Sequence, residues 1–167
     1  MIFVTLGSQK FQFNRLLKKI DVLIATGVIT EPVFAQIGAS DYIPRHYDYQ
    51  PFLDRETFSD YMSRCDIVIT HGGTGAIIGA VKKGRKVIAV PRLAKYGEHV
   101  DDHQLQLIRQ FDDLNLICRC DDVEELGLAL ADIRERQFAA YVSNTDAVIR
   151  SISAYIGQIT GENPEKE

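Results

Sequence analysis

Short apolar runs alternate along the chain with segments in which apolar residues recur every three or four positions. The runs are rich in β-branched residues, as strands covered on both faces are, and the second spacing predicts helices with one buried stripe. We expect strands over 2–6, 33–37, 67–69, 87–90 and 116–118, an extended segment within 42–49, and helices over 13–24, 58–62, 76–81, 100–111, 123–133 and 148–156. This alternation predicts an open, doubly wound α/β domain with a parallel sheet.

In such a sheet, ligands bind outside the carboxyl ends of the strands. We therefore expect functional residues in the loops that begin after residues 6, 37, 69 and 90. The first of these loops carries Gly7, Ser8 and Gln9. Their small side chains and amide suit a contact with a phosphate or a transferred group, although a plain strand-to-helix turn has the same composition.

Composition sets the broad class of the protein. The 167 residues, 46% of them hydrophobic and 25% charged, fit one globular domain over 1–160 and a polar tail over 161–167. A net charge of −4 argues against a nucleic-acid partner, and no apolar run reaches the roughly 18 residues of a membrane span. The apolar start is unlike a secretory signal. The odd number of cysteines, three, predicts buried thiols and a reducing, cytoplasmic compartment.

The strongest chemical signal is a loop that joins a buried strand to the next helix. It consists of His71, Gly72, Gly73, Thr74 and Gly75. Glycines let the backbone approach a ligand closely, and free N–H groups at a helix N-terminus suit an anion, a diphosphate above all. A tight turn whose glycines serve only packing fits the same pattern. His71 likewise fits a donor to a leaving phosphate or a ring bonded to the loop backbone. The spacing matches neither the dinucleotide fingerprint nor a P-loop.

A second polar segment, residues 96–104, opens the helix expected after the strand at 87–90. Asp101 as N-cap with Gln104 three residues later predicts a variant of the capping box. The same acidic and amide groups also suit the hydroxyls of a sugar. His99 and His103 lie one helical turn apart, as metal ligands can. No third ligand stands at a known spacing, and we therefore expect no metal site.

Four motifs, taken in order, resemble one family. They are M-I-F-V-T-L-G-S-Q, D-I-V-I-T-H-G-G-T-G, V-I-A-V-P-R-L and E-H-V-D-D-H-Q. Over nearly the whole chain, this ordered set resembles the C-terminal, donor-binding domain of glycosyltransferase family 28. The chain looks most similar to the catalytic subunits of bacterial two-component capsular and exopolysaccharide glycosyltransferases. Those are related to the catalytic subunit of the eukaryotic N-acetylglucosaminyldiphosphodolichol synthase.

The resemblance implies a Rossmann-like GT-B C-terminal half-domain that transfers a hexose, with inversion, from a UDP-sugar to a lipid-diphosphate-linked saccharide at the cytoplasmic face of a membrane. The glycine loop would hold the diphosphate, with His71 beside the leaving group. The segment from Tyr49 to Phe52 would contact uracil, and Gln104, with its two preceding residues, would meet the sugar. The implied substrate-binding set is Gly7, Ser8, Gln9, Tyr49, Phe52, His71, Gly72, Gly73, Thr74, Gly75, Asp102, His103 and Gln104. Family members need no divalent metal, and no D-x-D motif is present, so we expect no cofactor.

Two features depart from a complete GT-B enzyme. Many such enzymes bind the ribose through a glutamate on the helix after the glycine loop, and Gly79 occupies that position here. A complete enzyme also has two domains, and 167 residues supply one. We therefore expect a membrane-anchored partner subunit to provide the acceptor site and the catalytic base, and to recruit this chain to the membrane. A non-catalytic nucleotide-sugar-binding module and a UDP-sugar epimerase-like half-domain are the alternatives.

Overall fold

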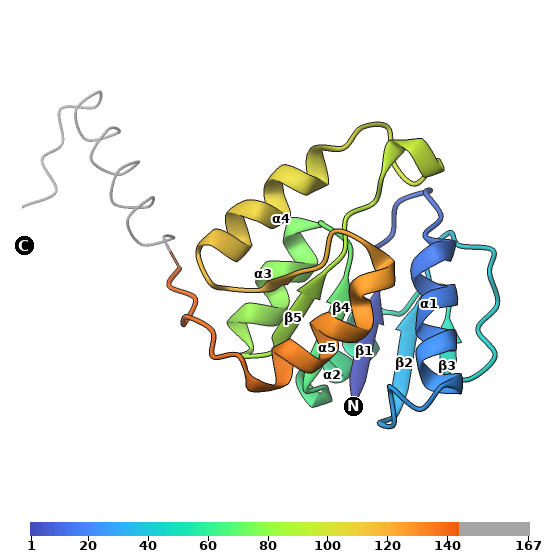
Figure 1. Cartoon of the computed structure of the whole chain (residues 1–167), viewed down its shortest axis with the longest axis horizontal. Coiled ribbons are helices and arrows are strands. Elements are labelled where there is room, and N and C mark those ends of the chain that lie inside the picture. Colours follow the sequence, from blue (N-terminus) through green and yellow to red (C-terminus); the bar gives the residue numbers. More distant parts are fainter. Residues whose placement is uncertain (144–167) are drawn as a thin grey trace, which may run out of the picture.

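The computed structural model describes residues 1–143, and within them six parallel strands form one sheet with helices on both faces (Figure 1). The sheet order is β3-β2-β1-β4-β5-β6. The strands are β1 (Ile2–Thr5), β2 (Val33–Gln36), β3 (Asp48–Gln50), β4 (Ile67–Thr70), β5 (Lys86–Ala89) and β6 (Cys118–Arg119). The helices are α1 (Asn14–Ala25), α2 (Arg55–Arg64), α3 (Thr74–Lys82), α4 (His103–Asp113) and α5 (Leu126–Glu135), with short 3-10 helices η1 (Ala94–Tyr96) and η2 (Val123–Glu125). The predicted doubly wound parallel sheet is confirmed.

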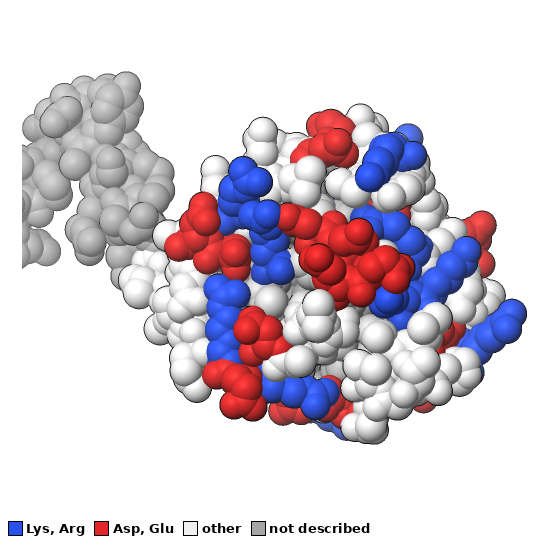
Figure 2. Space-filling model, in the orientation of Figure 1, with Lys and Arg blue, Asp and Glu red and all other residues white. Residues whose placement is uncertain are grey.

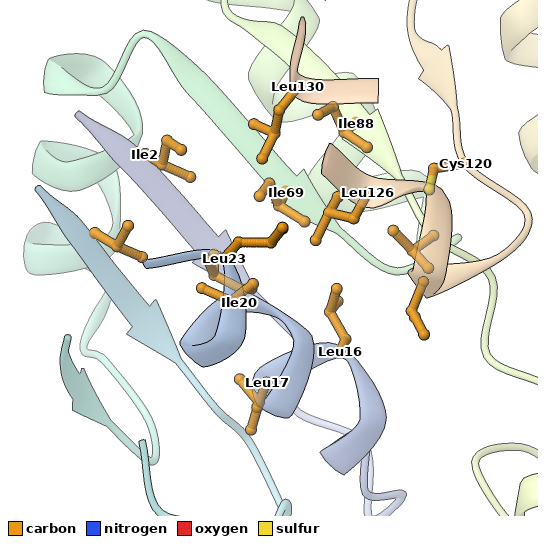
Figure 3. Packing of buried hydrophobic residues seen from close by; sticks show 14 of the residues in the cluster. Ile2, Leu16, Leu17, Ile20, Leu23, Ile69, Ile88, Cys120, Leu126 and Leu130 are labelled. Carbon is orange, nitrogen blue, oxygen red and sulfur yellow. The ribbon is translucent and has the colours of Figure 1, made fainter. Parts of the chain in front are cut away.

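The sheet has a hydrophobic core on each face, because successive side chains of a strand point to opposite sides. In β1, Ile2 and Val4 belong to a cluster that includes residues of α1 and α5 (Figure 3). Phe3 lies between them in sequence and belongs to the opposite cluster, with residues of α2, α3 and α4. Burial on both faces explains why the strands read as continuous apolar runs.

The sheet changes its direction of growth at β1. From β1 the chain adds β2 and β3 on one side, and it then returns to place β4, β5 and β6 on the other. β1 and β4 pair in register, with Thr5 opposite Thr70 at their carboxyl ends. The chain continues from β1 into α1 on one face and from β4 into α3 on the other. Sheets of this topology bind ligands in the crevice at such a point, which here lies at the carboxyl ends of β1 and β4.

The connection between β2 and β3 is held on α1 by the buried carboxylate of Asp21. This carboxylate accepts hydrogen bonds from Tyr42 Oη at 2.6 Å and from the backbone N–H groups of Arg45 and His46, each at 2.9 Å. Burial alone would raise the pKa of Asp21, but these hydrogen bonds, that of Tyr42 foremost, hold the pKa below its usual value. Of the extended segment expected within 42–49, only the end forms part of β3. The residues before it donate hydrogen bonds to the carboxylate of Asp21 and do not pair with the sheet.

The structure corrects the start of one predicted helix and confirms the burial of the cysteines. The helix expected over 100–111 begins only at His103, and Val100 lies outside it with 75% of its surface exposed. The three cysteines of the chain are buried and free, as predicted. Within residues 1–143 no helix is both long and apolar enough to cross a membrane. The helix expected over 148–156, the domain end at 160 and the polar tail lie outside the described residues.

Candidate functional site

The glycine loop leads from β4 into α3 at one side of the crevice. α3 begins at Thr74 with Gly73 as its N-cap, and no side chain in the described part of the chain caps it. The N–H of Ile77 bonds back to the Gly73 carbonyl at 3.2 Å. The preceding amides, those of Thr74, Gly75 and Ala76, therefore have no acceptor within the helix. Together with the positive end of the helix dipole, they form an anion-binding arrangement at the mouth of the crevice.

Gln104, the second residue of α4, ties the glycine loop to the segment after β5. Its Oε1 accepts hydrogen bonds from the backbone N–H groups of Gly72 at 3.2 Å and Arg92 at 3.1 Å. Because both partners donate, this atom is the amide oxygen, and Nε2 is the atom that faces His71 Nδ1 at 3.3 Å. The capping box expected between Asp101 and Gln104 is wrong, since the amide bonds two other segments instead of its own helix.

The imidazole of His71 is buried beside the glycine loop, and its protonation is fixed by its surroundings. Nδ1 accepts from Gln104, so the ring proton of the neutral form resides on Nε2. Burial, and after it the positive charge of Arg92, lowers the pKa of His71 to about 3. At neutral pH the ring can therefore donate one hydrogen bond from Nε2 to a phosphate oxygen. Its low pKa makes it a poor general base.

Close packing explains three of the glycines that the sequence singles out. A Cβ on Gly7 would lie 2.7 Å from Nε2 of His71, and a Cβ on Gly73 would lie 2.3 Å from Cε1 of the same ring. A Cβ on Gly72 would lie 2.6 Å from the Cβ of the glutamine that holds the loop. A Cβ on Gly75 would meet nothing within 4 Å. Packing therefore leaves Gly75 free to admit a ligand to the first turn of α3.

The loop after β1 borders the crevice on its other side. Gly7 has a φ of 70°, a conformation that favours glycine, and its carbonyl accepts from Gln36 Nε2 at 3.3 Å. A Cβ on Gly38, after β2, would lie only 2.9 Å from the same carbonyl oxygen. Ser8 and Gln9 follow and are exposed. The carboxyl end of β2 thus packs against the start of the loop after β1. The predicted contact residues Ser8 and Gln9 lie at the surface.

Arg92 is a site residue that sequence reasoning missed. It follows the proline that ends the run containing β5, and its side chain is fully buried. Nη2 donates to the carbonyls of Leu6 at 2.8 Å and Phe11 at 3.2 Å, at the two ends of the loop after β1. Within residues 1–143, Nε and Nη1 of this guanidinium have no hydrogen-bond partner. The sequence does contain a feature that could have indicated it: a basic residue shortly after an apolar strand, at the edge of the sheet where ligands bind.

Acidic side chains fix the segment between β5 and α4. Glu98 is 1% exposed and accepts from Arg15 Nε at 2.7 Å, and also from a backbone N–H of its own segment at 3.0 Å. Asp102 accepts from the backbone N–H of Ala94 at 2.8 Å. His103 begins α4 and is exposed. Of the two residues expected beside Gln104 at the sugar, Asp102 thus has a structural partner and His103 lies at the surface.

The remaining predicted residues lie apart from this cluster. Tyr49 belongs to the edge strand β3 and packs half-buried against the core, while Phe52 follows with 53% of its surface exposed. Two strands, β2 and β1, separate β3 from β4. The imidazole of His99 contacts Asp101 at 3.1 Å. In the part of the chain that the structure describes, no three potential metal-ligating side chains are grouped.

A parallel sheet with a glycine loop and an uncapped helix at its switch point is typical of α/β domains that bind anionic ligands. The family model of the Glycosyltransferase family 28 C-terminal domain matches residues 1–156. The chain therefore belongs to glycosyltransferase family 28. It corresponds to the C-terminal half of the two-domain GT-B fold.

Solved structures of two glycosyltransferases resemble this fold. The glycosyltransferase of kitacinnamycin is 17% identical with a TM-score of 0.62, and the match covers 81% of this chain and 35% of that one. MurG from Acinetobacter baumannii is 18% identical with a TM-score of 0.56, and here the match covers 81% and 41%. This chain thus spans less than half the length of either protein. No curated protein sequence matches it.

Proposed function

We propose that the chain binds the nucleoside diphosphate of a UDP-sugar in the crevice between β1 and β4. The observation that carries this proposal is the uncapped first turn of α3, whose N–H groups lie at the switch point of the sheet. The neutral imidazole of His71 adds a donor at Nε2 beside these amides. Family membership supports a donor-binding role, because glycosyltransferases use activated sugars.

The neighbouring residues suit roles around this diphosphate. Gly73, Thr74 and Gly75 supply the backbone N–H groups, Gly72 holds the loop close through its own bond to Gln104, and Gly7, Ser8 and Gln9 border the phosphate or the transferred sugar. Gln104 holds the loop in place, and we assign Asp102 and His103 to the sugar and the segment from Tyr49 to Phe52 to uracil. In this proposal the helix dipole and the loop amides stabilise the leaving UDP, and no divalent cation is required.

The proposed reaction is an inverting hexosyl transfer. An acceptor hydroxyl forms a bond to the anomeric carbon from the face opposite UDP, while the bond from that carbon to the β-phosphate oxygen breaks. The proton of the hydroxyl passes to a base, and the electron pair of the broken bond leaves with UDP. His71 is poorly suited as this base because burial lowers its pKa to about 3. We therefore assign the base to a partner subunit.

We further propose that the partner is a membrane-anchored subunit that binds a lipid-diphosphate-linked saccharide, as in capsular or exopolysaccharide synthesis. The matches cover only 35% and 41% of the two similar enzymes, so the residues matched here correspond to the donor half and leave an acceptor half to be supplied. Co-expression with a candidate single-span membrane protein should give transfer of labelled hexose from a UDP-sugar, and neither protein alone should do so. Transfer by the isolated chain would contradict this requirement. UDP binding without transfer in every pairing would favour a binding module.

The donor site itself is tested by Gly75→Asp. The side chain has open space, and a carboxylate in the first turn of a helix is favourable, so we expect the fold to gain about 0.5–1 kcal/mol. The same carboxylate repels a diphosphate, so UDP affinity measured by titration calorimetry should fall at least about tenfold. Ala131→Asp adds the same charge at an exposed position of α5 and serves as the matched control. If Gly75→Asp binds UDP as tightly as the native chain, the diphosphate is bound elsewhere.

A further inference from the structure

Unpaired buried polar atoms are concentrated at the switch point. Within residues 1–143, the buried side-chain nitrogen and oxygen atoms without a hydrogen-bond partner are Thr5 Oγ1 and the Nε and Nη1 of Arg92. Thr5 ends β1, and Arg92 follows β5 with its side chain reaching back to the same strand end. Buried donors are rarely left unpaired unless they serve a purpose, and a guanidinium is among the costliest groups to bury.

The carboxylate that acts on Arg92 is shared with another arginine. It belongs to Glu98, which is itself buried and already paired with Arg15 at 2.7 Å. Two guanidinium groups therefore share one carboxylate. Burial lowers the pKa of Arg92 to about 10, with the charge of Glu98 acting against this, so the group remains protonated at neutral pH. Within residues 1–143 Arg92 forms no ion pair with a carboxylate, and the group that its Cζ approaches, at 5.6 Å, is the ring of Phe13.

Arg92 is joined to both loops that border the proposed diphosphate site. The backbone N–H of Arg92 and that of Gly72 share the same acceptor, Oε1 of Gln104. Nη2 holds both ends of the loop after β1, at Leu6 and Phe11. The guanidinium also acts on the glycine loop through space, because its charge contributes to the low pKa of His71.

The face that bears α1 and α5 presents no broad basic surface to attract a polyanion (Figure 2). The chain carries a net charge of −4. On the face that bears α1 and α5, acidic side chains gather near η2 and basic ones are scattered around them (Figure 2). A polyanionic ligand is therefore not drawn by a broad basic surface on this face. Buried charges are also screened much less by salt than exposed ones.

We propose that Arg92 is the buried counter-charge of the donor's diphosphate. It is a positioning residue: it holds the loop after β1 through Leu6 and Phe11, and its excess charge attracts the phosphates through that loop without contacting them. This inference rests on the proposed function, because it needs a diphosphate in the crevice. It assigns to a protein side chain the electrostatic task that a divalent cation performs at other leaving diphosphates.

The test compares how strongly variants distinguish UDP from UMP, which carries less negative charge. Arg92→Met should weaken UDP binding about tenfold more than UMP binding, and Arg92→Lys should restore most of the difference. Glu98→Gln should shift the ratio the other way, in favour of UDP, because it removes the counter-charge. Lys10→Met removes an exposed cation from the same loop and is the matched control. Any loss of UDP binding caused by Lys10→Met should disappear at about 0.5 M salt, because an exposed charge is screened. The loss caused by Arg92→Met should persist.

The outcomes separate the two proposals. If the native chain does not bind UDP, the proposed function fails. If UDP binds but Arg92→Met weakens UDP and UMP equally, Arg92 only shapes the loop and the counter-charge is refuted. Glu98→Gln keeps the test decisive if Arg92→Met does not fold, because a merely structural Arg92 predicts no gain in the preference for UDP.

Discussion

Gln104→Leu should unfold far more easily than the native chain and lose most of its UDP affinity. The substitution keeps the volume but leaves three buried groups without a partner, namely the backbone N–H groups of Gly72 and Arg92 and Nδ1 of His71. Each such group costs about 1–3 kcal/mol, so we expect a loss of about 4 kcal/mol in the free energy of unfolding. Urea denaturation followed by circular dichroism measures it, since the chain has no tryptophan.

Binding measurements on the same variant separate two roles for this amide. A residue that only holds the loop should affect UDP and UDP-sugars equally, because both need the amides of α3. A residue that contacts the sugar should affect UDP-sugars alone. A variant with unchanged stability and a loss confined to UDP-sugars would contradict the structural role that the hydrogen bonds indicate.

Gln104→Glu provides the conservative partner of this test. One carboxylate oxygen can still accept from Gly72 and Arg92, but the other then faces Nδ1 of His71, which must be protonated to pair with it. In the native chain the pKa of His71 falls from 6.5 to about 3 on folding, so stability is lost as the pH drops below 6.5. In the variant the folded pKa of His71 is raised, so this loss is reduced and the variant should gain stability relative to the native chain as the pH falls from about 6.5 to about 3. If the free energies of unfolding of the variant and the native chain change with pH in parallel, the contact between residue 104 and Nδ1 of His71 is contradicted.

The fold was largely predictable because its strands are buried on both faces. Runs such as 67–69 and 87–90 are apolar throughout, and the helices between them repeat with a helical period, so element type and the parallel arrangement follow from the pattern. The same pattern predicts the position of the candidate site, since ligands of such sheets bind at the carboxyl ends of the strands. The finer contacts depended on tertiary partners that no local pattern contains.

Gln104 and Val100 illustrate how tertiary structure overrides local rules. Gln104 stands three residues after an aspartate, as a capping residue does, yet its amide is used by two loops that are distant in sequence. Val100 fits the helical spacing, but the acidic side chains that tie down the segment before α4 keep it outside the helix. Asp21 lies on the buried face of an apolar helix stripe, and its role becomes visible only once the β2–β3 connection folds over it.

Gly79 shows the limit of reading glycines as packing requirements. A Cβ at this position would meet nothing within 4 Å, so the structure does not require glycine where many GT-B enzymes place the ribose-binding glutamate. Gly72 and Gly73 differ, because the side chains that pack against them leave no room for a methyl group. The glycine loop thus combines positions dictated by His71 and Gln104 with positions that only leave space.

Gly73→Ala should destabilise the fold by about 3 kcal/mol through a single clash that a second substitution relieves. The backbone of Gly73, with φ of −74° and ψ of 115°, accepts alanine without strain, so the cost arises from the added Cβ, 2.3 Å from Cε1 of His71. The ring must move, and its contact with Gln104 is lost. His71→Ala should remove the clash, so the double variant should be more stable than the sum of the single effects implies, by about 2 kcal/mol.

Gly75→Ala is the matched control for this experiment, because it adds the same methyl group to the same loop in open space. It should leave stability unchanged or raise it slightly, since alanine is favoured over glycine in a helix. Additive effects of Gly73→Ala and His71→Ala would show that the imidazole does not pack against the loop. A coupled pair, with UDP binding lost in Gly73→Ala, would instead tie the position of the ring to the geometry of the amides that we propose bind the diphosphate.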